Sequence, residues 1–315
     1  MTPPKRLLLP YLLTVAIILS VTVAAATEFA VKAPLVTQSL LLDASMAGSR
    51  LVAVGERGHI IYSNDAGDTW QQAQVPTRAM LTGVFFIDQS LGWAVGHDAV
   101  ILKSTDGAAT WQLVHNAPEE ERPLLDIWFK SPQFGIAIGA YGYFLTTTDG
   151  GNTWSSTTIS EDDWHLNQLA VSENGTLYIA AEAGMLYRSQ DNGASWSMLP
   201  SPYEGSFFGA VSMGKNQLLV CGLRGHLFRT EDDGDNWIAV ETGTQAMLNG
   251  GLTLSDGRVV LVGLAGTVLI SSDRGKTVSL FQQPDRKGIS AALPLGNDHL
   301  ILFGEAGVRR IFLDN

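Results

Sequence analysis

The sequence has a single cysteine and a deficit of basic residues. Cys221 is the one cysteine among 315 residues, so no disulfide can form within the chain. It lies in the apolar run QLLVCGL, which favours a buried strand residue over a catalytic thiol. Twenty Lys and Arg residues stand against 31 Asp and Glu residues, and the formal net charge is −11. Because nucleic-acid binding needs basic side chains that neutralise phosphates, this balance argues against a nucleic-acid partner.

Charged residues and long apolar runs are also scarce. Charged side chains make up 16% of the chain and glycine occurs 33 times, a composition typical of a turn-rich β protein. The one long apolar run, Leu7–Val23, follows Lys5 and Arg6 and precedes Ala24–Ala26. At 17 residues, with Pro10 inside it, this run is short for a membrane span.

This N-terminal segment predicts export. A basic start, an apolar run and small residues at its end form a secretory signal peptide, residues 1–26, which we expect to be cleaved after Ala26. No cysteine stands near the cleavage site, which excludes a bacterial lipoprotein. The mature chain is expected in the periplasm, with a retained membrane anchor as the alternative.

One octapeptide pattern recurs six times along the chain. The copies are SNDAGDTW (Ser63–Trp70), STDGAATW (Ser104–Trp111), TTDGGNTW (Thr147–Trp154), SQDNGASW (Ser189–Trp196), TEDDGDNW (Thr230–Trp237) and SSDRGKTV (Ser271–Val278). Their aspartates are Asp65, Asp106, Asp149, Asp191, Asp232 and Asp273, separated by 41, 43, 42, 41 and 41 residues. A period near 42 residues corresponds to one four-stranded blade of a β-propeller.

Each repeat has the same order of predicted elements. An innermost strand, such as residues 81–86, 124–129 or 166–171, precedes a second strand that ends in glycine in most units. A two-residue hairpin follows, and its x-Gly pair suits the positive φ angles of a primed turn. These pairs are Arg57-Gly58, Tyr141-Gly142, Ala183-Gly184, Arg224-Gly225 and Ala265-Gly266, whereas the second unit has His97-Asp98-Ala99 instead.

A seventh unit lacks the octapeptide. Residues 288–313 supply three predicted strands, with Ala306-Gly307 as the hairpin. The segment Phe29–Pro34 has the form of a fourth strand that ends on proline, and we expect it to complete this last blade. The sequence therefore predicts an all-β, seven-bladed β-propeller, a single domain over residues 27–315, whose ring is closed by the N-terminal strand. Closure of this kind removes open sheet edges.

The octapeptides are interpreted as structural Asp boxes. The aspartate can accept hydrogen bonds from turn amides, the glycine supplies an unusual backbone conformation, and the tryptophan can pack between sheets. Turns that recur around a ring cannot all face one ligand. We therefore expect the box aspartates to be neither catalytic nor metal-binding, and the chain to use no cofactor.

The octapeptides resemble the bacterial neuraminidase repeat, which occurs in sialidases, in some xyloglucan-degrading hydrolases and in sortilin-type receptors. The whole unit, with AVGxxG about nine residues before the box, is more similar to the photosystem II stability/assembly factor family. The resemblance implies a non-catalytic seven-bladed propeller of the thylakoid lumen or an equivalent exported compartment. It also implies a role in the assembly or stability of a membrane protein complex. Arg57 and Arg224 match the family's arginine-rich face, whereas Glu56, Ala183, Ala265 and Ala306 interrupt that series.

Candidate binding residues lie in the hairpins and in the connections between blades, which share one face of a propeller. They are Arg57, Arg78, His97, Arg122, Tyr141, Trp164, His165, Tyr203, Arg224 and Arg286. Trp164 and Tyr203 are the strongest of these, because exposed aromatic side chains favour partner contacts. Matching positions in the innermost strands are expected to line the channel: Thr82, Asp126, Asn167, Asn249 and Ser290. The expected partner is a membrane protein or membrane-associated complex, bound by a monomeric propeller.

The rival interpretation is a sialidase-like Asp-box hydrolase or a carbohydrate-binding lectin. A glycosidase needs two carboxylates at a set separation, which Asp98 with Asp126, or members of Glu161–Asp163, could supply. The Arg-Ile-Pro motif of sialidases is absent, and no GxSxG motif is present. Glu161–His165 also offers carboxylate and imidazole groups to a metal, but consecutive residues rarely form a tight site. A deep aromatic pocket that holds two carboxylates would favour the hydrolase.

Overall fold

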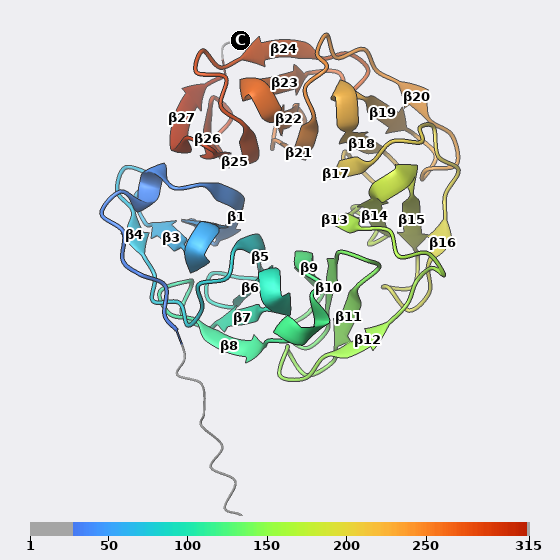
Figure 1. The fold of residues 1–315 in the computed structure, drawn as a ribbon. Helices are drawn as coiled ribbons and strands as arrows, with labels where there is room; N and C mark the ends of the chain where they lie inside the picture. Colours follow the sequence, from blue (N-terminus) through green and yellow to red (C-terminus); the bar gives the residue numbers. More distant parts are fainter. Residues whose placement is uncertain (1–27, 314–315) are drawn as a thin grey trace, which may run out of the picture.

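The computed structural model describes residues 28–313, so the predicted signal peptide lies outside the described residues. The chain forms seven antiparallel sheets arranged as blades around a central axis (Figure 1), which confirms the seven-bladed all-β propeller. Within residues 28–313, no helix is long and apolar enough to cross a membrane.

The blades follow one another in sequence order around the ring. Blade 1 consists of β1 (Leu41–Ala47), β2 (Arg50–Gly55), β3 (Ile60–Ser63) and β4 (Gln71–Gln72). Blade 2 consists of β5 (Leu81–Phe86), β6 (Gly92–Gly96), β7 (Ile101–Ser104) and β8 (Gln112–His115). Blade 3 consists of β9 (Leu124–Phe129), β10 (Gly135–Gly139), β11 (Phe144–Thr147) and β12 (Ser155–Thr157). Blades 4 and 5 are β13 (Leu166–Val171), β14 (Leu177–Ala181), β15 (Leu186–Ser189) and β16 (Ser197–Met198); β17 (Phe207–Ser212), β18 (Leu218–Gly222), β19 (Leu227–Thr230) and β20 (Ile238–Ala239). Blades 6 and 7 are β21 (Leu248–Thr253), β22 (Val259–Gly263), β23 (Thr267–Ser271) and β24 (Ser279–Gln282); β25 (Ile289–Leu295), β26 (His299–Gly304) and β27 (Gly307–Phe312). The innermost strands predicted at residues 81–86, 124–129 and 166–171 have the bounds of β5, β9 and β13.

The primed turns between the second and third strands are confirmed. Arg57 and Gly58 have φ angles of 56° and 70°, and the His59 N–H donates to the Glu56 carbonyl at 2.9 Å. Blade 2 keeps this geometry without glycine, since Asp98 and Ala99 have φ angles of 58° and 50°. Blade 7 differs, because in its turn only Gly307, at φ 69°, lies in this region.

The hairpin glycine is also required by space. A Cβ atom on Gly58 would lie 2.1 Å from the Thr77 carbonyl oxygen in the connection to the next blade. Gly184 and Gly225 meet Tyr203 and Thr244 in the same way. The hairpins and the blade connections therefore pack together on one face, here called the hairpin face.

The Asp boxes close turns on the opposite face, the Asp-box face. In the first box, Asp65 Oδ1 accepts the Thr69 N–H at 2.9 Å, and Ser63 Oγ accepts the Gly67 N–H at 2.8 Å. The Trp70 ring nitrogen donates to the Gly67 carbonyl at 3.2 Å. Side-chain and backbone hydrogen bonds from Thr69 hold the pKa of Asp65 at about 2. Each box aspartate is thus occupied in holding its own turn.

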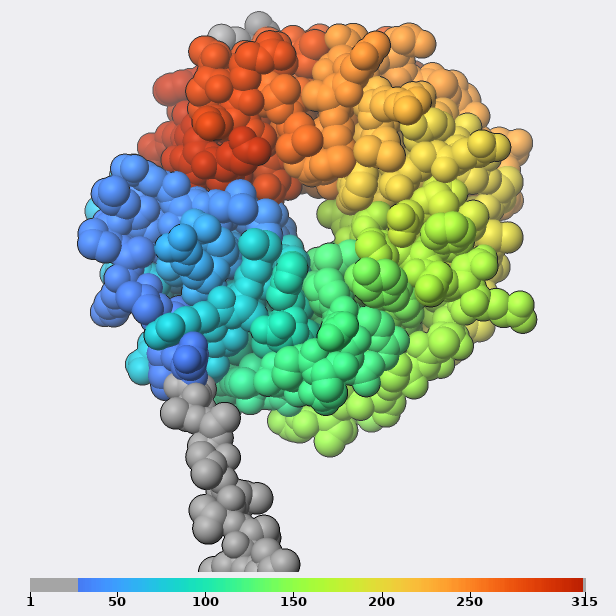
Figure 2. Space-filling model, in the orientation of Figure 1, coloured from blue at the N-terminus to red at the C-terminus, as the bar shows by residue number. Residues whose placement is uncertain are grey.

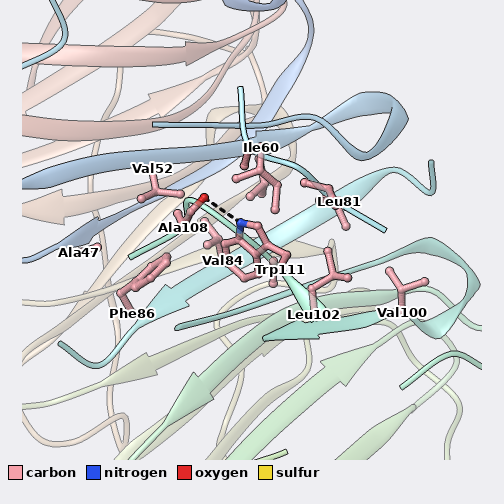
Figure 3. Close-up of a cluster of buried hydrophobic side chains, with 14 residues drawn as sticks. Ala47, Val52, Ile60, Leu81, Val84, Phe86, Val100, Leu102, Ala108 and Trp111 are labelled. Atoms are coloured by element: carbon pink, nitrogen blue, oxygen red, sulfur yellow. Dashed lines mark hydrogen bonds between the residues drawn. The ribbon is translucent and has the colours of Figure 1, made fainter. Parts of the chain in front are cut away.

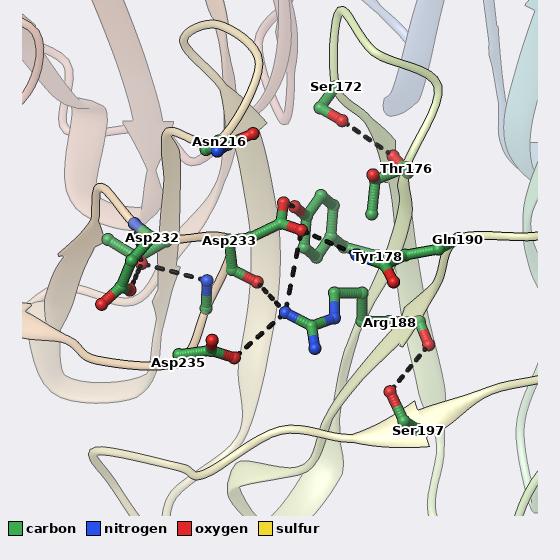
Figure 4. A network of polar contacts seen from close by, with 12 residues as sticks. Ser172, Thr176, Tyr178, Arg188, Gln190, Ser197, Asn216, Asp232, Asp233 and Asp235 are labelled. Atoms are coloured by element: carbon green, nitrogen blue, oxygen red, sulfur yellow. Dashed lines mark hydrogen bonds and ion pairs between the residues drawn. The ribbon is translucent and has the colours of Figure 1, made fainter.

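Basic residues extend from one blade to the box of the next blade. Figure 4 shows Arg188 of blade 4, whose guanidinium donates to the Asp233 carbonyl at 2.9 Å and pairs with Asp235 at 3.1 Å. The Tyr178 hydroxyl donates to the Asp233 carboxylate in the same network. Asp233 is the fourth residue of its box, and Lys103 reaches the equivalent Gly150 carbonyl at 2.8 Å. The boxes therefore also join neighbouring blades.

Hydrophobic clusters fill the spaces between blades. Figure 3 shows the cluster between blades 1 and 2, where Ile60 of β3 lies among side chains from β5 and β7 and Trp111 of the box. The Trp111 ring nitrogen donates to the Ala108 carbonyl at 3.1 Å, and the ring meets Phe86 edge-on with centroids 5.8 Å apart. Trp111 thus packs between two neighbouring sheets, as the repeat predicts for the box tryptophans.

Ring closure differs from the expectation. Residues 29–34 form no strand of blade 7; they lie along the outer edge of blade 1, where the Ala30 N–H donates to the Val75 carbonyl at 2.9 Å. The Gln72 amide binds the Val31 carbonyl and the Ala33 N–H, each at 2.9 Å. A short apolar segment ending on proline fits any outer edge, and the Gln72 side chain favours this one.

Packing and one arginine join blade 7 to blade 1. Phe303 of β26 is fully buried and meets Trp70 of the first box, with ring centroids 5.9 Å apart. Arg310 of β27 donates to the Ala66 carbonyl at 2.6 Å and pairs with Asp68 at 2.8 Å. Closure thus repeats the contacts that join other neighbouring blades.

The first prediction concerns this closure. Phe303→Ala should lower the free energy of unfolding by about 3–5 kcal/mol, because it leaves a cavity at the junction of blades 7 and 1. A chain that begins at Leu35 should lose less, since it keeps the Phe303 and Arg310 contacts. Urea unfolding followed by tryptophan fluorescence compares the two variants. A truncated chain less stable than Phe303→Ala would contradict closure by packing.

The second prediction concerns acid unfolding. The pKa of Asp149 is about 2, because Thr153 and Thr147 donate hydrogen bonds to its carboxylate. Its value in the unfolded chain is near 3.9, so the unfolded state binds the proton first and stability falls as pH drops from about 4 towards 2. Asp149→Asn should lower the melting temperature at pH 7 and flatten this acid decline. Asp162→Asn, at an exposed position outside the boxes, is the matched control and should change neither property.

Candidate functional site

The channel opens on the hairpin face into a pocket of about 520 Å³, here called the channel mouth. Figure 2 shows the opening at the centre of the ring. The five residues predicted from matching strand positions all line this pocket: Thr82, Asp126, Asn167, Asn249 and Ser290. Asp43, His165, Gln168 and Glu305 add further polar groups, and Phe208, Met247 and Leu264 add apolar surface.

The polar residues of the channel mouth connect the innermost strands of neighbouring blades. Asp43 Oδ2 accepts the Val84 N–H at 2.8 Å, and Asp126 Oδ2 accepts the Leu169 N–H at 2.7 Å. Gln168 accepts the Ala210 N–H at 2.7 Å in the same manner. Each of these acceptors is the third residue of its innermost strand.

A second set of side chains donates hydrogen bonds to the next blade instead of accepting them. Thr82, Asn167 and Asn249 are the second residues of their strands, and each donates to a carbonyl of the next blade at 2.7 Å. Asp43 and Gln168 were absent from the expected channel residues. Comparison of the third strand position across repeats would have identified them beside Asp126.

Two carboxyl groups of the channel mouth have raised pKa values. Asp43 and Asp126 are partly buried, and loss of hydration raises the pKa of each to about 7. The charge of Asp126 raises the pKa of Asp43 further, whereas the N–H groups of Val84 and Ala44 oppose the rise. Partial burial and mutual repulsion therefore disfavour the simultaneous ionisation of Asp43 and Asp126.

A second pocket on the hairpin face brings together two predicted residues. Tyr203 and Arg224 line a hollow of about 650 Å³ with His226, Phe228 and Glu241. The Tyr203 ring stacks on the His226 ring, with centroids 4.2 Å apart and planes 14° from parallel. Tyr203 also packs against Phe228, so it is half-buried. This hollow is called the Tyr203 pocket below.

A third group forms where blades 3 and 4 meet. The Tyr141 ring is 53% exposed and meets the His165 ring edge-on, with centroids 4.8 Å apart. His165 Nδ1 lies 3.7 Å from a Glu182 oxygen and the residue also lines the channel mouth. Trp164 is half-buried, and its ring nitrogen is covered without a hydrogen-bond partner. His165 thus connects this group to the channel.

The remaining candidates are distributed singly around the rim. Arg122 lies over the Tyr143 ring at 4.1 Å and pairs with Glu120. Arg78 donates to the Phe29 carbonyl at 3.0 Å, so it holds the N-terminal segment. Arg57, His97 and Arg286 are exposed at separate hairpins or connections. The expected arginine-rich face is therefore sparse.

No group of three or more His, Cys, Asp or Glu side chains within residues 28–313 has the arrangement of a metal site. Asp98 is exposed at a hairpin tip, whereas Asp126 is partly buried in the channel mouth. Cys221 is buried in β18, and burial raises the pKa of its thiol to about 12. The buried-strand interpretation of this cysteine is confirmed.

Comparison with known proteins identifies related sequences. The sequence model of the family described as "Photosynthesis system II assembly factor YCF48" matches residues 62–123 and 116–287. The chain is 41% identical over 130 residues to "Photosystem II assembly lipoprotein Ycf48" of Prochlorococcus marinus (strain MIT 9312). That alignment covers 41% of this chain and 38% of the relative, so the chain spans less than two fifths of the curated protein it matches.

Solved structures share the fold at low sequence identity. The structure titled "YCF48 bound to D1 peptide" superposes with a TM-score of 0.72 and 18% identity, covering 93% of this chain and 96% of that one. A streptogramin B lyase gives a TM-score of 0.74 with 12% identity, covering 91% of this chain and 99% of the lyase. Both likenesses reflect the propeller architecture.

The third prediction concerns the channel carboxyls. The folded state holds the Asp126 proton up to about pH 7 and the unfolded state releases it near pH 4, so stability falls as pH rises between these values. Asp126→Asn keeps an oxygen for the Leu169 N–H and cannot ionise. It should be more stable than the wild type at pH 8, by about 1–3 kcal/mol, and similar at pH 4. Calorimetric melting across this range measures the difference, and parallel profiles would contradict it.

Proposed function

Because the chain belongs to the photosystem II assembly factor YCF48 family, we propose that it is a non-catalytic scaffold for a membrane protein complex. It would bind an extended segment of a client membrane protein on its hairpin face and assist assembly or stability of that complex. A relative is named as a photosystem II assembly lipoprotein, and another family member was solved with a D1 peptide. A photosystem II protein is therefore the first client to test.

The Tyr203 pocket is the observation that carries this proposal. Tyr203 and His226 offer stacked ring edges, Arg224 offers a charge at an exposed hairpin tip, and Glu241 offers the opposite charge. Half-buried aromatic residues beside arginine are typical of protein-binding hot spots. The pocket adjoins blade connections, so a segment bound there would cross the rim of the propeller.

Two observations favour a scaffold over the hydrolase or lectin alternative. Asp43 and Asp126 accept backbone N–H groups of neighbouring blades, which is a structural task. The Asp-box aspartates are held by their own turns. Neither set presents a pair of free carboxylates to a substrate, as a glycosidase requires.

Export belongs to the same proposal. The basic and apolar N-terminus is the feature that supports a periplasmic or lumenal location, and we propose cleavage after Ala26. Sequencing of the mature N-terminus tests this part: a start at Thr27 supports it, and a retained Met1 or Thr2 contradicts it. The propeller is proposed to act as a monomer.

The fourth prediction tests the hairpin face. Arg224→Glu should reduce binding to a client segment about tenfold or more, because it reverses the charge at the pocket. Lys276→Glu makes the same charge change on the Asp-box face and should leave binding unchanged. Binding is measured on overlapping peptides that cover D1, and by crosslinking to membranes. Equal losses in both variants, or glycan binding without any peptide or membrane client, would contradict the scaffold.

A further inference from the structure

In the part of the chain that the structure describes, no strand pairs with the outer edge of β27. Six blades have four strands, whereas blade 7 has three within residues 28–313, and β27 is its outermost strand. The outermost strands of the other blades contain two to four residues, and β27 contains six, Gly307–Phe312. Proteins commonly keep exposed edge strands short to prevent unwanted pairing. The length of β27 departs from that practice.

The register shows which backbone N–H and C=O groups of β27 face away from β26. The Leu313 N–H donates to the Asp298 carbonyl at 2.8 Å, just beyond the paired residues Phe312 and His299. Because hydrogen-bonded pairs alternate along an antiparallel ladder, residues 307, 309 and 311 bond to β26. Val308, Arg310 and Phe312 therefore direct their N–H and C=O groups away from the sheet.

The arginines of β27 do not block this edge. Charged side chains on an edge strand normally hinder pairing. Here Arg309 is turned to Asp285 at 2.6 Å, and Arg310 is turned to the first Asp box. Phe312 at the end of the strand is 70% exposed and rests on the His299 ring, with centroids 4.2 Å apart. The edge thus combines open backbone groups with an exposed ring and a partly exposed positive charge.

The chain's own described segments do not fill the position. Residues 29–34 lie on blade 1, and the short turn Val36–Gln38 contacts only the hairpin end of β27. A second copy is disfavoured as well. The two antiparallel registers with the longest overlap would place Arg310 opposite Arg310, or Arg309 opposite Arg309, and like charges directly opposite each other are destabilising.

We propose that the outer edge of β27 binds an extended segment of a partner protein, which adds the fourth strand of blade 7. Main-chain hydrogen bonds from Val308, Arg310 and Phe312 would supply the affinity. A carboxylate beside Arg310 and an apolar side chain beside Phe312 would set the register. This surface is separate from the Tyr203 pocket, so the proposal stands independently of the client binding proposed above.

The fifth prediction tests this edge with a synthetic peptide. The probe is seven residues long, alternates valine and threonine around one central glutamate, and is blocked at both ends. The control is the same peptide with alternate backbone amides methylated. In the free protein, the amides of Val308, Arg310 and Phe312 should exchange with deuterium faster than those of Arg309 and Ile311. The unmethylated peptide should slow the three outward amides about tenfold or more, because each joins a ladder.

Two variants distinguish the contribution of the backbone hydrogen bonds from that of the Phe312 side chain. Phe312→Pro removes one outward N–H and should abolish most of the peptide's protection, whereas Phe312→Ala removes only the ring and should weaken it modestly. Any of three outcomes would overturn the proposal. They are slow exchange at these amides in the free protein, protection that grows with protein concentration, and equal protection by the methylated peptide. Arg224→Glu should leave this protection intact, so failure here is distinguishable from failure at the hairpin face.

Discussion

Hydrogen bonds between innermost strands are the interaction on which the ring depends. Within residues 28–313, each blade is a separate sheet, so no continuous backbone ladder joins one blade to the next. Side chains in the second and third positions of the innermost strands cross this gap to neighbouring backbone groups, as Asp126 does to Leu169. The apolar clusters between blades then bury the faces of the sheets. Removal of one crossing leaves a buried N–H or C=O unsatisfied, which makes these few polar residues costly to change.

The two faces divide the tasks of the repeat. On the Asp-box face, each motif holds its own turn, and the first five boxes also receive a basic residue from the preceding blade of the ring, as Asp233 does from Arg188. Those side chains have little freedom for recognition. On the hairpin face, the glycines hold the backbone while the preceding residue faces solvent, as Arg57 and Arg224 do. Variation is therefore tolerated on the face where a partner would be recognised.

The features that recur in each unit could be predicted from the sequence. The features in which the chain departs from its repeat could not. The period, the strand bounds and the primed turns follow from local rules that apply equally in each unit. Ring closure does not, because the fit of residues 29–34 depends on Gln72, a contact between segments that no periodic pattern encodes. Tyr203 was expected in a loop, but its stacking on His226 required the two blades' backbones to be placed first. Asp43 could not be predicted as a channel residue, because only alignment of the innermost strands by position shows that it is equivalent to Asp126.

The left-handed residue at each hairpin tip has a consequence for how such a propeller could diversify. Arg57, Asp98, Tyr141, Ala183, Arg224 and Ala265 occupy nearly the same φ, between 53° and 58°, although their chemistry ranges from cationic to aromatic. The turn accepts this strained conformation whatever the side chain, because the surrounding backbone determines it. The rim therefore presents six equivalent positions, one in each of blades 1 to 6, at which single substitutions change the surface chemistry without altering the fold. Successive substitutions at these positions could therefore change the binding specificity of the propeller one blade at a time.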